Sequence, residues 1–194
     1  MSRSGDQIRF HVPSDFGPTE DASKGEYPKM STRGDNRAGG SLKRIPRVVS
    51  ALTSQGSLYR VIEAQSPEAE AVADWIESHF PIIGVQIEWA KVSSSRCIEW
   101  SETADLMKAF ASIAQDLPRK TTMIVTWSDA LYPSLEMPLS EVEKAAPAIF
   151  ESSFDTWIVC ESENWCIEVH HEGTICFGYG RPSFVFLGVK EGHR

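Results

Sequence analysis

The sequence lacks any apolar run that approaches the ~20 residues needed to cross a lipid bilayer. Its first residues are polar and charged at the positions where a secretory signal peptide requires an apolar core. No internal repeat is evident, which excludes solenoid and propeller architectures. We therefore expect a cytoplasmic protein without a membrane anchor.

Cysteine is scarce, with four residues in a chain of 194 and no closely spaced pairs. A disulfide scaffold is excluded on this basis, and a reducing compartment would keep the cysteines as thiols. If the turn after Glu161 has three residues, Cys160 and Cys166 lie opposite each other across a hairpin. A redox switch is conceivable there, but such bridges are strained and a free cysteine usually behaves as a small buried hydrophobe. We expect structural thiols at all four positions.

The common catalytic signatures are also missing. The chain contains no GxxxxGK[ST] phosphate loop, no GxGxxG after a strand, no GxSxG elbow and no HExxH. His170 and His171 stand beside Glu168, but adjacent residues of a strand point to opposite faces, so the two imidazoles are not expected to share an ion. Glu168 and His170 share a face and could form an acid–base pair, although such a pair is more often a plain surface contact. The sequence predicts no metal, no cofactor and no catalytic residue.

Two regions differ in composition. Residues 1–55 are filled with Gly, Ser, Pro and charged residues and show no sustained apolar pattern, so they cannot bury enough apolar surface to offset their chain entropy. Residues 56–194 are rich in Trp, Phe, Ile and Val. The sequence therefore predicts a disordered leader over 1–55, or a translation start at Met30, followed by a single domain over 56–194.

Hydrophobic periodicity predicts two well-defined helices. In residues 66–80, Ser66 is a good N-cap, Pro67 suits the first turn, and apolar residues recur at helical spacing. The second helix is expected over residues 101–117, with Ser101 as its cap.

A third helical piece is expected to begin at Ser140, and Pro147 should break or kink it. Strands are predicted where β-branched and aromatic residues cluster, over 58–64, 85–89, 96–100, 121–127, 156–160, 165–170 and 174–179. The 96–100 strand should pair with 85–89, and the nearly continuous apolar run 121–127 should be central. The expected fold is α+β: a mixed, largely antiparallel sheet with two to three helices and a C-terminal β-meander.

Charge is distributed unevenly along the chain. The net charge is −8, although residues 1–50 carry nine basic and six acidic residues. Between Thr121 and Gly180, ten acidic residues accompany a single basic one, Lys144. A surface of one sign repels nucleic acid and attracts basic partners, whereas the simplest alternative is that the acidity only provides solubility.

The C-terminal segment carries a resemblance to a known class. Residues 155–159 and the stretch Trp165-Cys166-Ile167-Glu168-Val169-His170-His171-Glu172-Gly173-Thr174-Ile175-Cys176-Phe177 resemble the C-terminal meander of small bacterial proteins, some of which are similar to immunity proteins of polymorphic toxin systems. This resemblance implies one-to-one binding that blocks a toxin in the cytoplasm, often a basic nuclease. Turns place side chains in solvent, so the expected partner-binding residues flank the two final hairpin turns: Glu161, Glu163, Glu168 and Glu172, with Trp165 as a central aromatic anchor.

Other classes of function fit the same sequence. An acidic interaction or adaptor domain unrelated to toxins would show the same charge and the same missing motifs. A hydrolase or transferase with an unrecognised site would need a concave pocket that contains carboxylates with perturbed pKa values. Small-molecule sensing is a further alternative.

Overall fold

A seven-stranded sheet with helices on both faces organises the chain. The computed structural model describes residues 42–182. Its elements are η1 (Leu42–Arg44), α1 (Pro46–Ser54), β1 (Arg60–Ile62), α2 (Pro67–His79), β2 (Ile82–Ile83), β3 (Gln86–Ile87), η2 (Trp89–Lys91), β4 (Arg96–Glu99), α3 (Thr103–Ala114), β5 (Thr122–Trp127), β6 (Ser134–Pro138), α4 (Leu139–Phe150), β7 (Thr156–Cys160), β8 (Trp165–His170) and β9 (Thr174–Tyr179).

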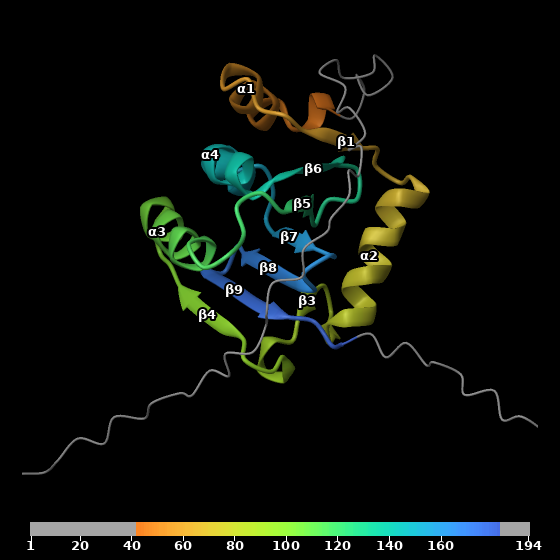
Figure 1. The fold of residues 1–194 in the computed structure, drawn as a ribbon, viewed down its shortest axis with the longest axis vertical. Coiled ribbons are helices and arrows are strands. Elements are labelled where there is room, and N and C mark those ends of the chain that lie inside the picture. The colour runs from red at the N-terminus through yellow and green to blue at the C-terminus, as the bar shows by residue number, and fades with distance from the viewer. Residues whose placement is uncertain (1–41, 183–194) are drawn as a thin grey trace, which may run out of the picture.

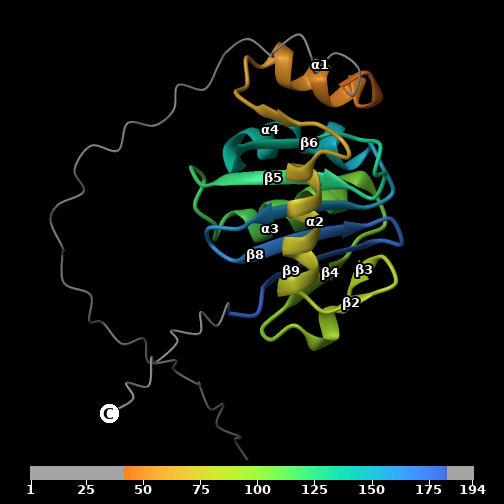
Figure 2. The same cartoon turned by 90° about the vertical axis from the view of Figure 1, so that its right-hand side faces the viewer.

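The main sheet has the strand order β1-β6-β5-β7-β8-β9-β4, while β2 and β3 form a separate hairpin. Neighbouring strands pair antiparallel throughout, which confirms the α+β class and the largely antiparallel sheet. Helices α1, α3 and α4 cover one face (Figure 1). Helix α2 crosses the strands on the other face, with the β2–β3 hairpin beside it (Figure 2).

Two apolar clusters fill the spaces between these layers. The larger lies under α1, α3 and α4 and includes Phe110, Met123 and Ile167. The smaller lies under α2 and includes Ile76 and Cys166. Strand β5 contributes to both clusters, because Met123 and Val125 are buried in the first and Ile124 packs on the second. The expectation that 121–127 is a central strand is confirmed.

The helix predicted from Ser66 is confirmed. The Ser66 side chain accepts a hydrogen bond from the backbone N–H of Ala69 at 3.2 Å, and Pro67 occupies the first turn. This contact satisfies one of the N–H groups that a helix N-terminus leaves unpaired. Val72 and Ile76 then bury one stripe of the helix against the sheet.

The disordered leader predicted over residues 1–55 includes residues that are folded in the structure. Residues 46–54 form α1, and Ile45, Val48 and Leu52 are at most 1% exposed in the main core. Their spacing of three and four residues is that of a helix with one apolar face, a signal that the polar and charged residues around them obscured. The ordered part therefore includes at least residues 42–54, while the remainder of the predicted leader, 1–41, lies outside the described residues.

The prediction for residues 85–100 was wrong in its pairing. Of the strand expected over 85–89, only Gln86 and Ile87 form one, and they pair with β2 across a turn in which Gly84 has a φ of +62°. The strand from Arg96 pairs instead with β9 at the edge of the main sheet. The 3₁₀ turn at 89–91 separates β3 from β4, which local periodicity could not reveal.

Three further details differ from expectation. Strand β6 was not predicted, because its five residues lie between turn residues and end in a proline. The N-cap of α3 is Glu102, without a side-chain cap hydrogen bond, and Ser101 donates to Asp105 instead. Pro147 does not end α4, which continues to Phe150.

The C-terminal meander has the three strands that the sequence predicted. Their register differs from the expected one, because Cys160 pairs with Trp165 and Cys166 pairs with Val159. Cys160 and Cys166 therefore lie in different apolar clusters, and both are free thiols.

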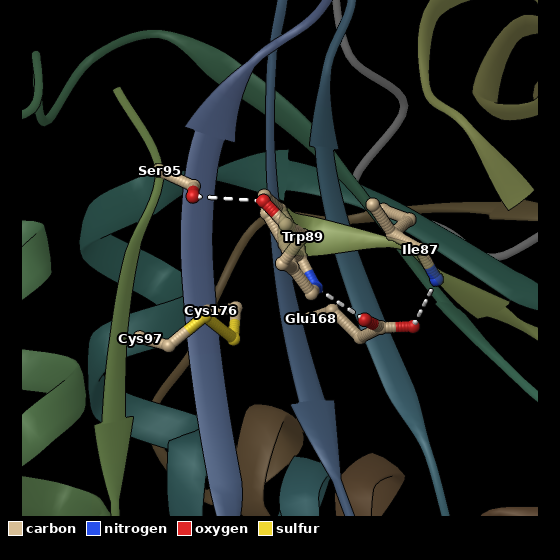
Figure 3. The surroundings of a disulfide bond; sticks show 6 residues. All are labelled: Ile87, Trp89, Ser95, Cys97, Glu168 and Cys176. Carbon is tan, nitrogen blue, oxygen red and sulfur yellow. Dashed lines mark hydrogen bonds between the residues drawn. A yellow bond between two sulfur atoms is a disulfide. The ribbon is translucent and has the colours of Figure 1, made fainter. Parts of the chain in front are cut away.

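The other two cysteines contradict the prediction of four thiols. Cys97 on β4 and Cys176 on β9 are cross-strand partners and form a disulfide, with Cα atoms 4.1 Å apart (Figure 3). The strand pairing brings together residues separated by 79 positions in the chain. In residues 42–182, no helix combines the length and apolarity that a membrane span requires.

Candidate functional site

A buried carboxylate lies in the middle of the sheet. Glu168 stands on β8, between Trp157 of β7 and Cys176 of β9, and is 3% exposed. It faces the side of the sheet on which α2 and the β2–β3 hairpin lie. An acid in this position requires hydrogen-bond donors, because removing an ionised group from water is costly.

Three N–H groups supply those donors. The backbone N–H of Ile87 donates to Oε1 of Glu168 at 3.2 Å, the indole N–H of Trp89 to Oε2 at 2.5 Å, and the indole N–H of Trp157 to Oε1 at 2.8 Å. Figure 3 shows the Ile87 and Trp89 contacts. Burial raises the pKa of Glu168 above its ordinary value, and the three hydrogen bonds and nearby His170 oppose that rise. The carboxylate therefore fastens the segment 86–89 to the sheet.

A second group of polar side chains, centred on Asp155, lies at the C-terminal end of β8. The carboxylate Oδ1 of Asp155 accepts from the backbone N–H of His171 at 3.1 Å and lies 2.8 Å from Nδ1 of that ring. Nε2 of His170 lies 3.5 Å from the same oxygen and also contacts the side-chain amide of Gln86. Asp155 and His170 are buried, so these contacts fix the turn that joins β8 to β9.

The two histidines do not point to opposite faces of a strand, so the reason given in the sequence analysis against a shared ion was wrong. His171 lies in the turn after β8, and its ring centroid is only 4.4 Å from that of His170. Together with Asp155, the two rings offer three ligand atoms within 4.8 Å of one another. A zinc ion with bonds of ~2.0–2.2 Å is compatible with such spacings.

One hydrogen bond at His170 differs from the usual pattern of a metal-bound histidine. The backbone N–H of Glu172 donates to Nδ1 of His170 at 3.3 Å, so this nitrogen is unprotonated. The other ring nitrogen, Nε2, faces both Asp155 and the side-chain amide of Gln86. With a metal at Nε2, Nδ1 would still accept this hydrogen bond, whereas a metal-bound histidine ordinarily donates from its other nitrogen.

Two of the five expected partner-binding residues are not on the surface. Trp165 is 1% exposed in the main core, and its ring lies 5.9 Å from that of Phe177. Glu168 is buried under Trp89, as described above. The prediction of Trp165 as an exposed anchor was therefore wrong. Trp165 lies on the face of β8 that packs against the main core, and not in the turn.

Glu161, Glu163 and Glu172 are exposed, but they do not lie together. The first two are in the turn before β8 and the third is in the turn after it. A six-residue antiparallel strand separates its two turns by about 20 Å. The three glutamates therefore belong to opposite edges of the sheet.

Each of these two edges is the end of the sheet at which the strands meet their loops, and not an outer strand. We call them the acidic edge and the mixed edge. The acidic edge consists of the loops 63–66, 100–102, 128–133, 151–155 and 171–173, and the mixed edge of 55–59, 92–95, 115–121, 161–164 and 180–182. The strand register places the first set together, since Ile62 pairs with Ser134, Trp127 with Thr156, and both His170 and Glu99 with Thr174.

The two edges differ in charge. The loops of the acidic edge contain six acidic residues and no lysine or arginine: Glu63, Glu102, Asp129, Glu151, Asp155 and Glu172. The loops of the mixed edge contain Asp116, Glu161 and Glu163 together with Arg119, Lys120 and Arg181. Only the tertiary structure reveals this separation, because the two sets alternate along the chain.

The acidic edge also exposes an aromatic ring that the sequence analysis missed. Phe154 is 76% exposed, the highest value among the exposed large hydrophobic residues of the described part of the chain. It borders a hollow lined by Ser128, Asp129, Tyr132, Glu151, Ser152, Ser153 and Phe154. The available signal was weak, namely a single phenylalanine in the polar loop before β7.

These features describe a scaffold whose buried acids and histidines are engaged in structural contacts and whose charged groups gather at its rim. Comparison with protein families assigns the chain to the immunity proteins, a class whose partner is a toxin. The model of the family described as CdiI immunity protein EcoliA0-like matches residues 51–178, and the chain belongs to this family. The resemblance drawn from the C-terminal meander is confirmed. No curated protein matches the chain.

Proposed function

We propose that this protein neutralises a basic, nuclease-like toxin by covering its active surface in a one-to-one complex. Membership of an immunity protein family supports a toxin as the partner. The observation that carries the finer proposal is charge, because ten acidic residues accompany a single basic one between Thr121 and Gly180.

A nuclease must attract a polyanionic substrate, so its active cleft is positively charged. An acidic protein that fits this cleft excludes the substrate and gains electrostatic attraction at the same time. The same negative charge repels phosphate, so we do not expect the folded domain to bind nucleic acid directly.

Inhibition by binding requires no chemistry from the immunity protein. Glu168, Asp155, His170 and His171 are the groups in the described residues that most resemble a reactive cluster, and hydrogen bonds engage each of them. We therefore propose an inhibitor without enzymatic activity or cofactor, acting in the cytoplasm where a delivered toxin would meet its substrate.

The proposal predicts that a toxin domain is encoded next to this gene, and that domain provides the test. Co-expression of the full chain should protect cells from that domain, and the purified proteins should form a one-to-one complex by light scattering. The association rate should fall steeply as ionic strength rises past ~0.1 M, where the Debye length is about 10 Å, while dissociation changes much less. Failure to bind or protect would contradict the proposed function, and a salt-independent association rate would contradict the basic partner.

A further inference from the structure

We infer that the acidic edge is the surface that contacts the toxin, with Phe154 as its anchor and a lysine- or arginine-bearing segment of the toxin as its occupant. This inference rests on the proposed function and adds where the contact lies. It also replaces Trp165, which is buried, with an aromatic residue that is accessible.

The acidic edge is a continuous feature of the fold. It gathers loops at the ends of all seven strands, which at 4.7–4.9 Å per strand span about 29 Å. That length is similar to the width of an ordinary protein–protein interface of ~800 Å² per partner. A single partner can therefore contact several of these loops at once.

Hydrogen bonds hold the loops in place. The backbone N–H of Ser128 donates to the carbonyl of Asp155 at 3.1 Å, and the hydroxyls of Ser128 and Ser153 lie 3.2 Å apart. The backbone N–H of Trp100 donates to the carbonyl of Gly173 at 2.8 Å. Loops fixed before binding lose less conformational entropy when a partner docks.

Phe154 provides an apolar contact at the centre of this charge. Its ring lies 5.5 Å from the ring of His171 and is otherwise accessible. An exposed phenyl face attracts a cation positioned within ~6 Å of its centroid. Asp129 and Glu151 line the same hollow and supply carboxylates for that cation.

The local charges leave this hollow available to a basic group. Glu151 pairs with Arg47 at 3.3 Å, and both side chains are largely exposed, so a partner can replace this contact at little cost. Asp129 accepts a hydrogen bond from the backbone N–H of Leu131 at Oδ1. Leu131, in the same loop as Asp129, is itself exposed.

The mixed edge is a poorer match for a basic partner. Its Glu161 and Glu163 share their side of the sheet with Arg119, Lys120 and Arg181, so attraction and repulsion offset each other there. This difference provides matched controls within one molecule, because two exposed glutamates and one exposed aromatic residue can be substituted at each edge. On the mixed side the aromatic residue is Tyr179, which is 53% exposed.

The experiment measures binding of the full chain to the same toxin domain that tests the proposed function. The test variants are Phe154→Ala and the double reversal Glu151→Lys with Glu172→Lys. The control variants are Tyr179→Ala and the double reversal Glu161→Lys with Glu163→Lys. Thermal unfolding of each variant establishes that it is folded before association and dissociation rates are compared.

We expect Phe154→Ala to weaken the complex about tenfold or more, mainly by faster dissociation, as for a central aromatic anchor. The reversal at Glu151 and Glu172 should slow association about tenfold at low salt. Both control variants should bind within about twofold of the wild-type protein, as peripheral substitutions commonly do.

The outcomes separate this inference from the function on which it rests. If the wild-type chain does not bind the toxin domain, the proposed function fails and the inference fails with it. If the wild-type chain binds and the folded acidic-edge variants bind equally well, the function stands and the assignment of the surface is wrong. Stronger losses from the mixed-edge variants, or from Ile83→Asp on the exposed β2–β3 hairpin, would also overturn the assignment.

Discussion

Glu168 accepts a hydrogen bond from the indole N–H of Trp89, a residue 79 positions earlier in the chain, at 2.5 Å. This contact joins the central strand of the C-terminal meander to the 3₁₀ turn that follows the β2–β3 hairpin. The same carboxylate accepts from Ile87 and Trp157, so it serves as a common acceptor for three N–H groups.

Replacing Glu168 with alanine should destabilise the protein by about 3 kcal/mol or more, because it leaves three N–H donors without an acceptor at roughly 1–3 kcal/mol each. Urea unfolding followed by tryptophan fluorescence measures this loss. Amide exchange at Ile87 should accelerate more than exchange in β5, since the segment 86–89 loses its attachment. Glu168→Gln retains an acceptor oxygen and should cost less; an alanine variant as stable as the wild type would show that the contact is dispensable.

The raised pKa of Glu168 predicts a specific dependence of stability on pH. Its folded-state pKa lies above the ordinary value of 4.5, so the folded protein holds this proton more tightly than the unfolded chain does. The contribution of Glu168 to the free energy of unfolding is therefore greatest below the unfolded pKa and falls as pH rises through the folded pKa.

The comparison with Glu168→Gln isolates this contribution from other groups, among them Glu68 and Glu141, whose pKa values are lowered. Chemical unfolding across the acidic and neutral range should show the stability difference between wild type and variant changing with pH in that direction. A difference that stays constant, or that favours the wild type increasingly as pH rises, would contradict it.

Under oxidising conditions, the Cys97–Cys176 disulfide should stabilise the folded chain by about 2–4 kcal/mol, because it closes a long loop in the unfolded state. Urea unfolding with and without reductant measures this difference, and Cys97→Ser with Cys176→Ser should match the reduced protein. Thiol titration of the unfolded, unreduced chain should detect two thiols, from Cys160 and Cys166. Detection of four thiols would show that the bridge does not form.

Helix α1 should be required for full stability even though the family match begins only at residue 51. Leu52→Ala removes a fully buried side chain and should cost about 2–5 kcal/mol. Arg47→Ala on the exposed side of the same helix is the control and should change stability by less than about 0.5 kcal/mol. A chain truncated to residues 56–194 that unfolds at the same urea concentration as the full chain would show that α1 is not part of the core.

Asp155, His170 and His171 should bind no stoichiometric zinc, since hydrogen bonding directs the lone pair of His170 Nδ1 to the N–H of Glu172. Elemental analysis of protein purified without added metal should find well below one equivalent per chain. Asp155→Asn should lower thermal stability with or without chelator, because the turn at His171 loses a charged acceptor. Zinc retained at one equivalent and lost in Asp155→Asn would show that the three residues form a metal site.

Local sequence patterns predicted the elements whose signals are complete within a short window. Ser66 and Pro67 mark the start of α2, and the alternation of turn residues with β-branched residues gives the three strands of the meander. The patterns failed where neighbours far along the chain decide the outcome. Strand β6 is short, contains no β-branched or aromatic residue and ends in a proline, and its pairing with β1 and β5 on both sides establishes it as a strand.

For the candidate site too, the sequence predicted what local position decides and missed what long-range contacts decide. Exposure of Glu161, Glu163 and Glu172 could be expected from their places in turns, whereas the burial of Glu168 depends on Trp89 and Ile87 covering it. The strand pairing also decided which cysteines meet: Cys97 and Cys176 are brought into register, and Cys160 and Cys166 are not.

The sequence by itself determined the acidic character of the chain, the α+β class and the resemblance to immunity proteins, because composition, periodicity and short patterns are local properties. The tertiary structure alone decided that Trp165 is buried and Phe154 exposed, and that Glu172 lies at a different edge from Glu161 and Glu163. The physical reason is the antiparallel sheet: successive turns emerge at alternate ends of the strands, so residues adjacent in sequence separate and residues distant in sequence gather along one edge.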